Sequence, residues 1–154
     1  MIKNRVVIDA CVFLKLFLDE EGSNEARIFF KKIVTNEDTQ IIVPSLFLHE
    51  VMAQISKTNF SLEIVFECFK MYNSVCLTVV DIDLETSLKA KDIIATTSHP
   101  KSGFPSFYDA SYHALAMLNN CDFITADKKH YDKTKQLGSI KLLEDVVSKN
   151  LTNA

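Results

Sequence analysis

The sequence predicts an α/β protein with a central parallel sheet of about five strands and helices on both faces. Two patterns alternate along the chain: short apolar runs rich in Val and Ile, and longer segments whose apolar residues repeat at helical spacing. The short runs are apolar throughout, which is typical of strands buried on both faces of a parallel sheet. Strands that alternate with helices form right-handed crossovers, which place helices on both faces of the sheet.

The composition indicates one ordinary globular domain. The 154 residues suit a single core and leave little room for a second domain. Of these residues, 47% are hydrophobic and 24% are charged, as is typical of globular proteins. No repeat, low-complexity tract or linker divides the chain. We therefore expect one domain over residues 1–148 and a polar tail over residues 149–154.

Several features favour a cytoplasmic protein without membrane contact. No apolar run approaches the roughly 18 residues that suggest a membrane-spanning helix. Asp9 and Lys15 interrupt any signal-peptide core near the N-terminus. The four cysteines lack metal-ligand spacing, and we interpret them as small buried residues in a reducing compartment. The net charge of −3 argues weakly against binding nucleic acid by electrostatics alone.

The first half of the chain contains three predicted strands, at 6–9, 40–43 and 74–80. Four helices separate them, and Ser23 and Ser45 are predicted to cap the second and third helices. The apolar residues at helical spacing are, helix by helix, Val12, Phe13, Leu16 and Phe17; Ala26, Phe29, Phe30 and Ile33; Leu48, Val51, Met52 and Ile55; and Leu62, Val65, Phe66 and Phe69.

The second half of the chain contains two further strands separated by helices. The predicted elements are, in order, a helix carrying Leu84, Leu88, Ile93 and Ile94, a loop at 98–105, a helix from Ser106 to Asn120, a strand at 121–125, a short helix at 128–135, a strand at 140–143 and a last helical turn. Each of the five strands is therefore followed by helical sequence, as parallel neighbours require.

The first strand ends in a carboxylate, Asp9. Ligands of open α/β sheets bind in the crevice beyond the carboxyl ends of the strands, so an acid here points to a functional site. The alternative is that Asp9 only caps the helix beginning near Cys11, where a carboxylate meets free backbone N–H groups. This stretch alone favours neither interpretation.

Three further acids occupy comparable positions. Asp127 ends the fourth strand, in a near repeat of the arrangement at Asp9. Glu50 lies one turn into the helix after the second strand, among apolar neighbours, where a carboxylate costs free energy without a partner or ligand. Asp109 follows Ser106 by three residues, which is also the spacing of a capping box, so its role stays open.

A cluster of these acids would bind Mg²⁺ or Mn²⁺. Clustered carboxylates repel one another, which raises some of their pKa values unless a cation is present. Two such cations can activate a water and stabilise the leaving oxygen of a phosphodiester. No competing motif is present: the chain lacks a P-loop and a nucleophile elbow. His49-Glu50 begins like a zinc-protease helix, but the second histidine of that motif is Ala53 here.

Four short motifs surround the acids. They are Val6-Val7-Ile8-Asp9-Ala10, Pro44-Ser45-Leu46 leading to Glu50, Tyr108-Asp109-Ala110 with Tyr112 and Ala114-Leu115-Ala116, and Ile124-Thr125-Ala126-Asp127-Lys128. With these motifs in this order, the sequence resembles the PIN-domain family, and most closely the VapC-type toxins of bacterial and archaeal toxin–antitoxin pairs. The resemblance covers residues 6 to about 142, which is nearly the whole chain.

The resemblance implies a three-layer α/β/α fold, in which a PIN-like domain acts as a metal-dependent endoribonuclease. By analogy, we also expect RNA as the substrate, a homodimer, and an antitoxin protein that silences the site. The catalytic and metal-binding acids of the family carry over to Asp9, Glu50, Asp109 and Asp127, and its hydroxyl residue beside the metals carries over to Thr125.

Basic residues near the acids are candidates for substrate contact. Lys128 and Lys129 follow Asp127 directly and would neutralise phosphates without reading sequence. Lys15, on the first helix, is a third candidate. A solvated helix face explains the basic residues after Asp127 at least as well.

Three aromatic residues, Phe104, Phe107 and Tyr108, surround the loop before the helix of Asp109. Aromatic side chains stack on unpaired bases in proteins that bind single strands. Packing within the chain and an oligomer contact are the alternatives.

The sequence therefore predicts a Mg²⁺- or Mn²⁺-dependent ribonuclease. A hypothesis from another class is a PIN-like module that binds RNA or a protein partner without cleaving. Cys11 supports it, because family members commonly have Ser, Thr or Asn there and a thiol is a poor ligand for a hard cation. A phosphoacceptor signalling domain is disfavoured, because Asp9 stands alone after the first strand and the expected lysine at the fifth strand is missing.

Overall fold

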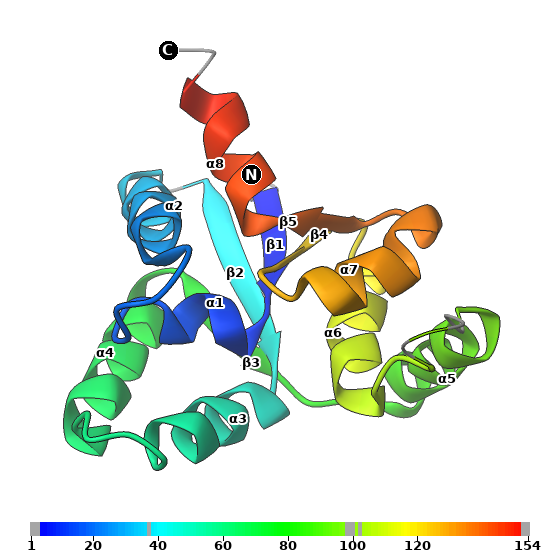
Figure 1. The fold of residues 1–154 in the computed structure, drawn as a ribbon, viewed down its shortest axis with the longest axis horizontal. Coiled ribbons are helices and arrows are strands. Elements are labelled where there is room, and N and C mark those ends of the chain that lie inside the picture. The colour runs from blue at the N-terminus through cyan, green and yellow to red at the C-terminus, as the bar shows by residue number, and fades with distance from the viewer. Residues whose placement is uncertain (1–3, 37, 98–100, 102, 152–154) are drawn as a thin grey trace.

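Five strands form a parallel sheet at the centre of the computed structural model, which describes residues 4–36, 38–97, 101 and 103–151 (Figure 1). The strands are β1 (Asn4–Ile8), β2 (Thr39–Pro44), β3 (Leu77–Val80), β4 (Asp122–Thr125) and β5 (Ile140–Leu142). Their order in the sheet is β3-β2-β1-β4-β5, and every neighbouring pair is parallel. The predicted parallel sheet of about five strands is confirmed.

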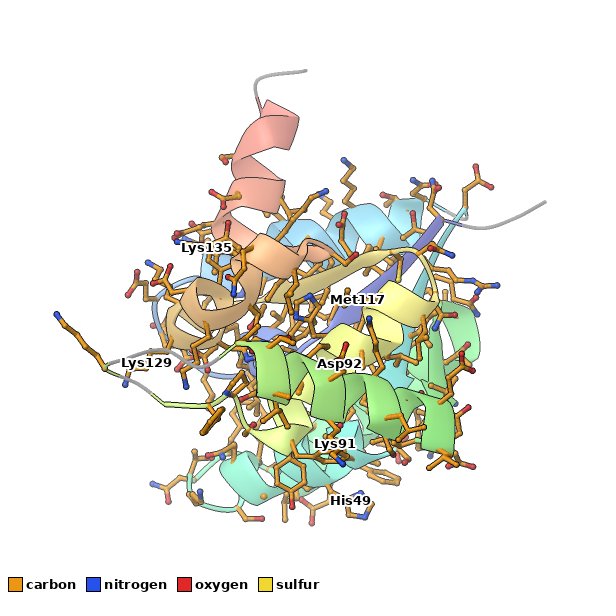
Figure 2. The ribbon with its side chains drawn as sticks, turned by 90° about the vertical axis from the view of Figure 1, so that its right-hand side faces the viewer. His49, Lys91, Asp92, Met117, Lys129 and Lys135 are labelled. Atoms are coloured by element: carbon orange, nitrogen blue, oxygen red, sulfur yellow. The ribbon has the colours of Figure 1, made fainter. Side chains whose placement is uncertain are left out.

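Helices cover both faces of this sheet, so the predicted three-layer α/β/α fold is also confirmed. In Figure 1, α1, α2 and α4 lie on one side of the sheet and α5 and α6 lie on the other. Figure 2 looks onto the second layer, where α5 lies outermost and carries Lys91 and Asp92. The helices are α1 (Ala10–Leu14), α2 (Ser23–Thr35), α3 (Leu46–Ile55), α4 (Leu62–Val75), α5 (Leu84–Thr96), α6 (Phe107–Leu118), α7 (Lys128–Thr134) and α8 (Leu143–Leu151), with a 3₁₀ turn at Lys135–Leu137.

An aromatic cluster fills the core between the sheet and the first helical layer. The ring of Phe13 is fully buried and lies 5.8 Å from that of Phe30, 5.6 Å from that of Phe47 and 5.9 Å from that of Tyr72. Each such pair contributes about 0.5–1.5 kcal/mol beyond the burial of apolar area. The cluster therefore fixes α1, and with it the residue that precedes α1, against the sheet.

The register of the central strands brings distant parts of the chain together. β1 lies between β2 and β4, and Ile8 pairs with Ile124. The backbone N–H of Asp9 donates to the carbonyl of Ile124 at 3.0 Å, which extends this pairing one residue beyond β1. The residues that follow β1 and β4 therefore meet at one edge of the sheet.

One predicted strand boundary and two predicted caps differ from the structure. The third strand begins at Leu77, because α4 continues through Val75 and the N–H of Cys76 closes its last turn on the carbonyl of Tyr72. Ser45 has helical backbone angles and makes no capping bond. Ser23 does not cap α2 either, because its hydroxyl donates to the carbonyl of Leu18 and accepts from the N–H of Glu20.

The C-terminal segment is more helical than predicted. α8 begins at Leu143 and continues to Leu151, so the tail predicted from 149 has its first three residues in a helix. Residues 152–154 of that tail lie outside the described residues, as do 98–100 and 102 of the predicted loop. None of the helices that the structure describes is long and apolar enough to cross a membrane.

Candidate active site

Asp9 occupies the centre of the candidate site. Its side chain is only 6% exposed and follows β1 directly. One carboxylate oxygen accepts from the N–H of Cys11 at 3.3 Å, and the other accepts from the hydroxyl of Thr125 at 2.9 Å. Asp9 therefore caps α1, as one interpretation of the sequence required, and also contacts the end of β4.

Burial, the largest cause, and the negative charge of Asp109 together raise the pKa of Asp9 to about 6. The hydrogen bonds from Thr125 and Cys11 act against this shift. A carboxylate in this position is destabilised because it has lost water and faces another acid.

Glu50 approaches the same place from the first turns of α3. Burial is the largest cause that raises its pKa to about 7, followed by the charge of Asp9, with a smaller effect of Asp109. Its Oε1 accepts a hydrogen bond from the hydroxyl of Tyr112 at 3.2 Å, which lowers the pKa. Glu50, Asp9 and Asp109 thus act on one another electrostatically.

Tyr112 was not assigned a role from the sequence. Its side chain is fully buried on α6, and its ring stacks on Phe123 of β4 with 5.7 Å between the centroids and 6° between the planes. A buried tyrosine hydroxyl needs a partner, and here that partner is Glu50. Its position three residues after Asp109, on the inward face of the helix, was the only local signal.

Asp109 is both a capping residue and a member of the acidic group. The hydroxyl of Ser106 donates to Oδ2 of Asp109 at 2.7 Å, and the N–H of Asp109 donates back to that hydroxyl at 3.0 Å. The capping box that the sequence left open is therefore present. It holds Asp109 where its charge still raises the pKa of Asp9 and Glu50.

Asp127 completes the group from the end of β4. Its Oδ1 caps α7 by accepting from the N–H groups of Lys129 at 2.9 Å and His130 at 3.1 Å. Its own N–H donates to the hydroxyl of Thr125 at 3.0 Å, so Thr125 joins Asp127 to Asp9.

The buried ring of His130 lies close to both Asp109 and Asp127. Burial lowers the pKa of His130, whereas the charges of Asp109 and Asp127 both raise it. Asp109 and Asp127 therefore both lie near this imidazole. In Figure 1, the helices that carry or follow the four acids, α1, α3, α6 and α7, begin at the same end of the sheet.

The donor set of this site suits a hard divalent cation. It consists of carboxylate and hydroxyl oxygens, and the raised pKa values of Asp9 and Glu50 reflect burial first and the charges of neighbouring acids second. Within the part of the chain that is described, no three His, Cys, Asp or Glu side chains converge closely enough to form a ready-made metal cage. Mg²⁺ usually keeps several waters and takes one or two carboxylates, so such a cage is not required.

Cys11 lies against the same group. Burial raises the pKa of its thiol well above the usual value, and the charge of Asp9 adds to this shift. The thiol therefore stays protonated near neutral pH, and a protonated thiol does not bind a hard cation.

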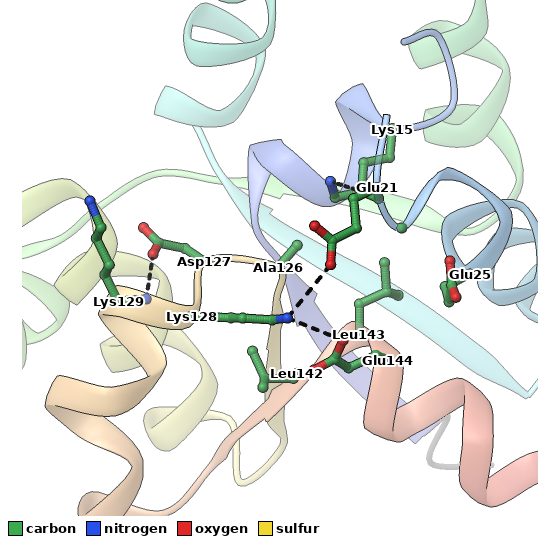
Figure 3. A pocket seen from close by; sticks show the side chains of 11 residues that line it. Lys15, Glu21, Glu25, Ala126, Asp127, Lys128, Lys129, Leu142, Leu143 and Glu144 are labelled. Carbon is green, nitrogen blue, oxygen red and sulfur yellow. Dashed lines mark hydrogen bonds and ion pairs between the residues drawn. The ribbon is translucent and has the colours of Figure 1, made fainter. Parts of the chain in front are cut away.

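The three candidate lysines line one cavity of about 540 Å³ beside Asp127 (Figure 3). Lys128 lies between two acids in that view, with Nζ 3.7 Å from Glu21 and 3.5 Å from Glu144.

Lys15 also contacts the loop that contains Glu21. Its Nζ donates to Glu20 at 3.0 Å and to the carbonyl of Glu21 at 2.6 Å. Lys15 thus ties the loop before α2 to the end of α1, and Lys128 links that loop to α7 and α8, while Lys129 is exposed and lines the cavity.

A comparison of the sequence with known families decides what this arrangement is. The sequence profile of the PIN domain matches residues 6–136. The chain belongs to the PIN-domain family. No match was found among curated protein sequences.

Solved structures share the fold of this PIN domain at low sequence identity. VapBC2 from Rickettsia felis, bound to a promoter DNA fragment, superposes with a TM-score of 0.65 and 13% identity, over 90% of this chain and 98% of that chain. A toxin–antitoxin complex from Klebsiella pneumoniae gives 0.65 and 16%, over 90% and 97%. VapC20 from Mycobacterium tuberculosis, described as a sarcin–ricin loop cleaving toxin, gives 0.60 and 10%, over 78% and 86%.

Proposed function

We propose that this PIN domain is a Mg²⁺- or Mn²⁺-dependent endoribonuclease that acts as the toxin of a toxin–antitoxin pair. The observation that carries the proposal is the buried acidic group: the hydroxyl of Thr125 joins Asp9 to Asp127 by hydrogen bonds, and burial, followed by the charges of neighbouring acids, raises the pKa of Asp9 and Glu50. An enzyme retains such repulsion where a cation relieves it during function.

The proposal gives each residue a role. Asp9 and Asp127 hold metal from the ends of β1 and β4, and Glu50 and Asp109 complete the set of ligands. Thr125 positions Asp9 through its hydroxyl, which also accepts from the N–H of Asp127. When bound, the cation supplies a water of lowered pKa and neutralises charge on the phosphodiester.

The structural relatives support RNA as the substrate and an antitoxin as the partner. One is described as a toxin that cleaves the sarcin–ricin loop, and two others are toxin–antitoxin complexes. By analogy, we propose that this chain also forms a homodimer, acts in the cytoplasm and is silenced by an antitoxin.

The test is cleavage of a mixed pool of structured and single-stranded RNA by the purified protein with Mg²⁺, with Mn²⁺ and with EDTA. Asp9→Asn is prepared identically, and Asp19→Asn serves as a matched control because Asp19 is an exposed aspartate outside the acidic group. Cleavage that requires metal, disappears in Asp9→Asn and persists in Asp19→Asn supports the proposal. If the protein binds RNA but cleaves it with neither Mg²⁺ nor Mn²⁺, the alternative of a binding module, which Cys11 suggests, would be favoured.

A further inference from the structure

Three large aromatic side chains before Asp109 lie outside the core and are exposed. Phe104 is 63% exposed, Phe107 44% and Tyr108 62%. Three exposed rings within five residues concentrate apolar side chains on one short segment, and such concentrations mark candidate binding sites. None of the three rings is a core residue, so packing in the core does not account for them.

The backbone that presents these rings is held firmly on both sides. Pro105 is buried, and the hydroxyl of Ser106 caps the first turn of α6. On the other side, Nζ of Lys133 on α7 donates to the carbonyl of Phe104 at 3.2 Å. The rings thus belong to an anchored segment that leads into α6 and contacts α7.

This segment adjoins the acidic group at two points. Phe107 and Tyr108 are the first residues of α6 and directly precede Asp109. The backbone of Phe104 is tied to α7, the helix that Asp127 caps. The segment that carries the rings is therefore close to the acidic group.

We propose that Phe104, Phe107 and Tyr108 form a stacking surface for unpaired RNA bases beside the cleaved phosphodiester. The proposal rests on the ribonuclease function proposed above and names the form of RNA that the site takes. In a duplex the faces of the bases are covered by their neighbours, whereas unpaired bases can stack on aromatic side chains.

Charge near the rings favours RNA over an apolar protein segment as the occupant. Lys129 is exposed on α7, the helix to which half-buried Lys133 ties the backbone of Phe104, and its positive charge suits the phosphates of a strand whose bases stack on the rings. Because every base has a π face, the surface selects unpaired structure and tolerates different sequences.

The experiment measures RNA binding in the Asp9→Asn background, where the RNA stays intact. The probe is a single-stranded 12-nucleotide RNA carrying one 2-aminopurine, and its perfect duplex is the comparison. Phe104→Leu combined with Tyr108→Leu removes two rings but keeps apolar side chains. Leu84→Ala combined with Leu88→Ala is the control, because these residues are also highly exposed and lie on α5.

The expected result is a loss of about tenfold in single-strand affinity for each ring removed, without change in the weaker duplex binding. The wild-type rings quench 2-aminopurine fluorescence, and the leucine variant does not. The control variant behaves like its parent. Because the substituted side chains are exposed, thermal unfolding should stay unchanged and exclude misfolding.

Unchanged single-strand affinity and quenching in the leucine variant would overturn the stacking surface. A simultaneous change from dimer to monomer would then assign the rings to an oligomer contact. The ribonuclease proposal survives that result if the enzyme with native Asp9 still cleaves RNA with metal. Absence of both RNA binding and metal-dependent cleavage in the unsubstituted protein would refute the proposed function and the stacking surface with it.

Discussion

Replacing Asp9 by Asn should stabilise the protein in the absence of metal. The pKa of Asp9 is raised from 3.8 to about 6 by burial and by Asp109. A shift of about two pKa units corresponds to about 3 kcal/mol of destabilisation when the carboxylate is ionised. The amide forms weaker hydrogen bonds with Cys11 and Thr125, which costs about 1 kcal/mol. The net expectation at pH 7.5 is a gain of about 2 kcal/mol, or about 4–8 °C in Tm.

The pH dependence of this gain follows from the sign of the shift. A carboxyl group whose pKa is raised in the folded state costs nothing below its unfolded pKa of about 4, and its cost grows as the pH rises through about 6. The difference between Asp9→Asn and wild type should therefore be small or reversed at pH 4.5 and favour the variant at pH 7.5.

Urea unfolding in EDTA at both pH values measures this difference, with Asp19→Asn as the control for loss of one exposed negative charge. Adding Mg²⁺ should stabilise wild type and leave Asp9→Asn nearly unchanged, because a ligand stabilises only the state that binds it. An Asp9→Asn variant that is less stable than wild type at pH 7.5 in EDTA would refute the claim that Asp9 is held at an electrostatic cost.

Three further predictions concern metal binding, measured by calorimetry or Mn²⁺ electron paramagnetic resonance. Mn²⁺ affinity should fall as the pH drops through about 7, because Glu50 becomes protonated, and Glu50→Gln should flatten this dependence. Tyr112→Phe should weaken Mn²⁺ binding about tenfold at pH 7, because the pKa of Glu50 rises without its hydrogen bond; the deficit should shrink at pH 8.5, and equal affinities at pH 7 would contradict this role. Cys11→Ser should raise Mn²⁺ affinity by up to about tenfold, because a hydroxyl suits the water shell of a hard cation; unchanged affinity would show that the thiol is not limiting.

The central strands were predictable because their sequences admit one interpretation. Val7 and Ile8 are buried on β1, as are Ile41 and Val43 on β2, so uninterrupted apolar runs matched strands buried on both faces. The start of β3 was not predictable, because Val75 suits the last turn of a helix as well as a strand. The packing of α4 determines where that helix ends and β3 begins, and the spacing of apolar residues in the sequence does not predict this packing.

The candidate site was predictable where acids end strands and less so where partners are remote. Asp9 and Asp127 follow from strand ends, whereas the spacing of Asp109 fits a capping box and a ligand equally, and the structure shows the box in place. The partner of Tyr112 is Glu50, on another helix 62 residues away, and no local pattern reveals such a pair. The ion pairs of Lys128 with Glu21 and Glu144 were not predictable either, because these partners lie on other segments of the chain.

The hydrogen bond between Asp9 and Thr125 joins residues 116 positions apart, and β1 has β4 as one of its two neighbours. During synthesis, the chain emerges from its N-terminus, so Asp9 leaves the ribosome long before the strand that completes its surroundings. Contacts of such long sequence separation form late and slow the folding of the whole domain. The acidic centre is therefore assembled only after β4, which follows Asp9 by more than a hundred residues, has left the ribosome.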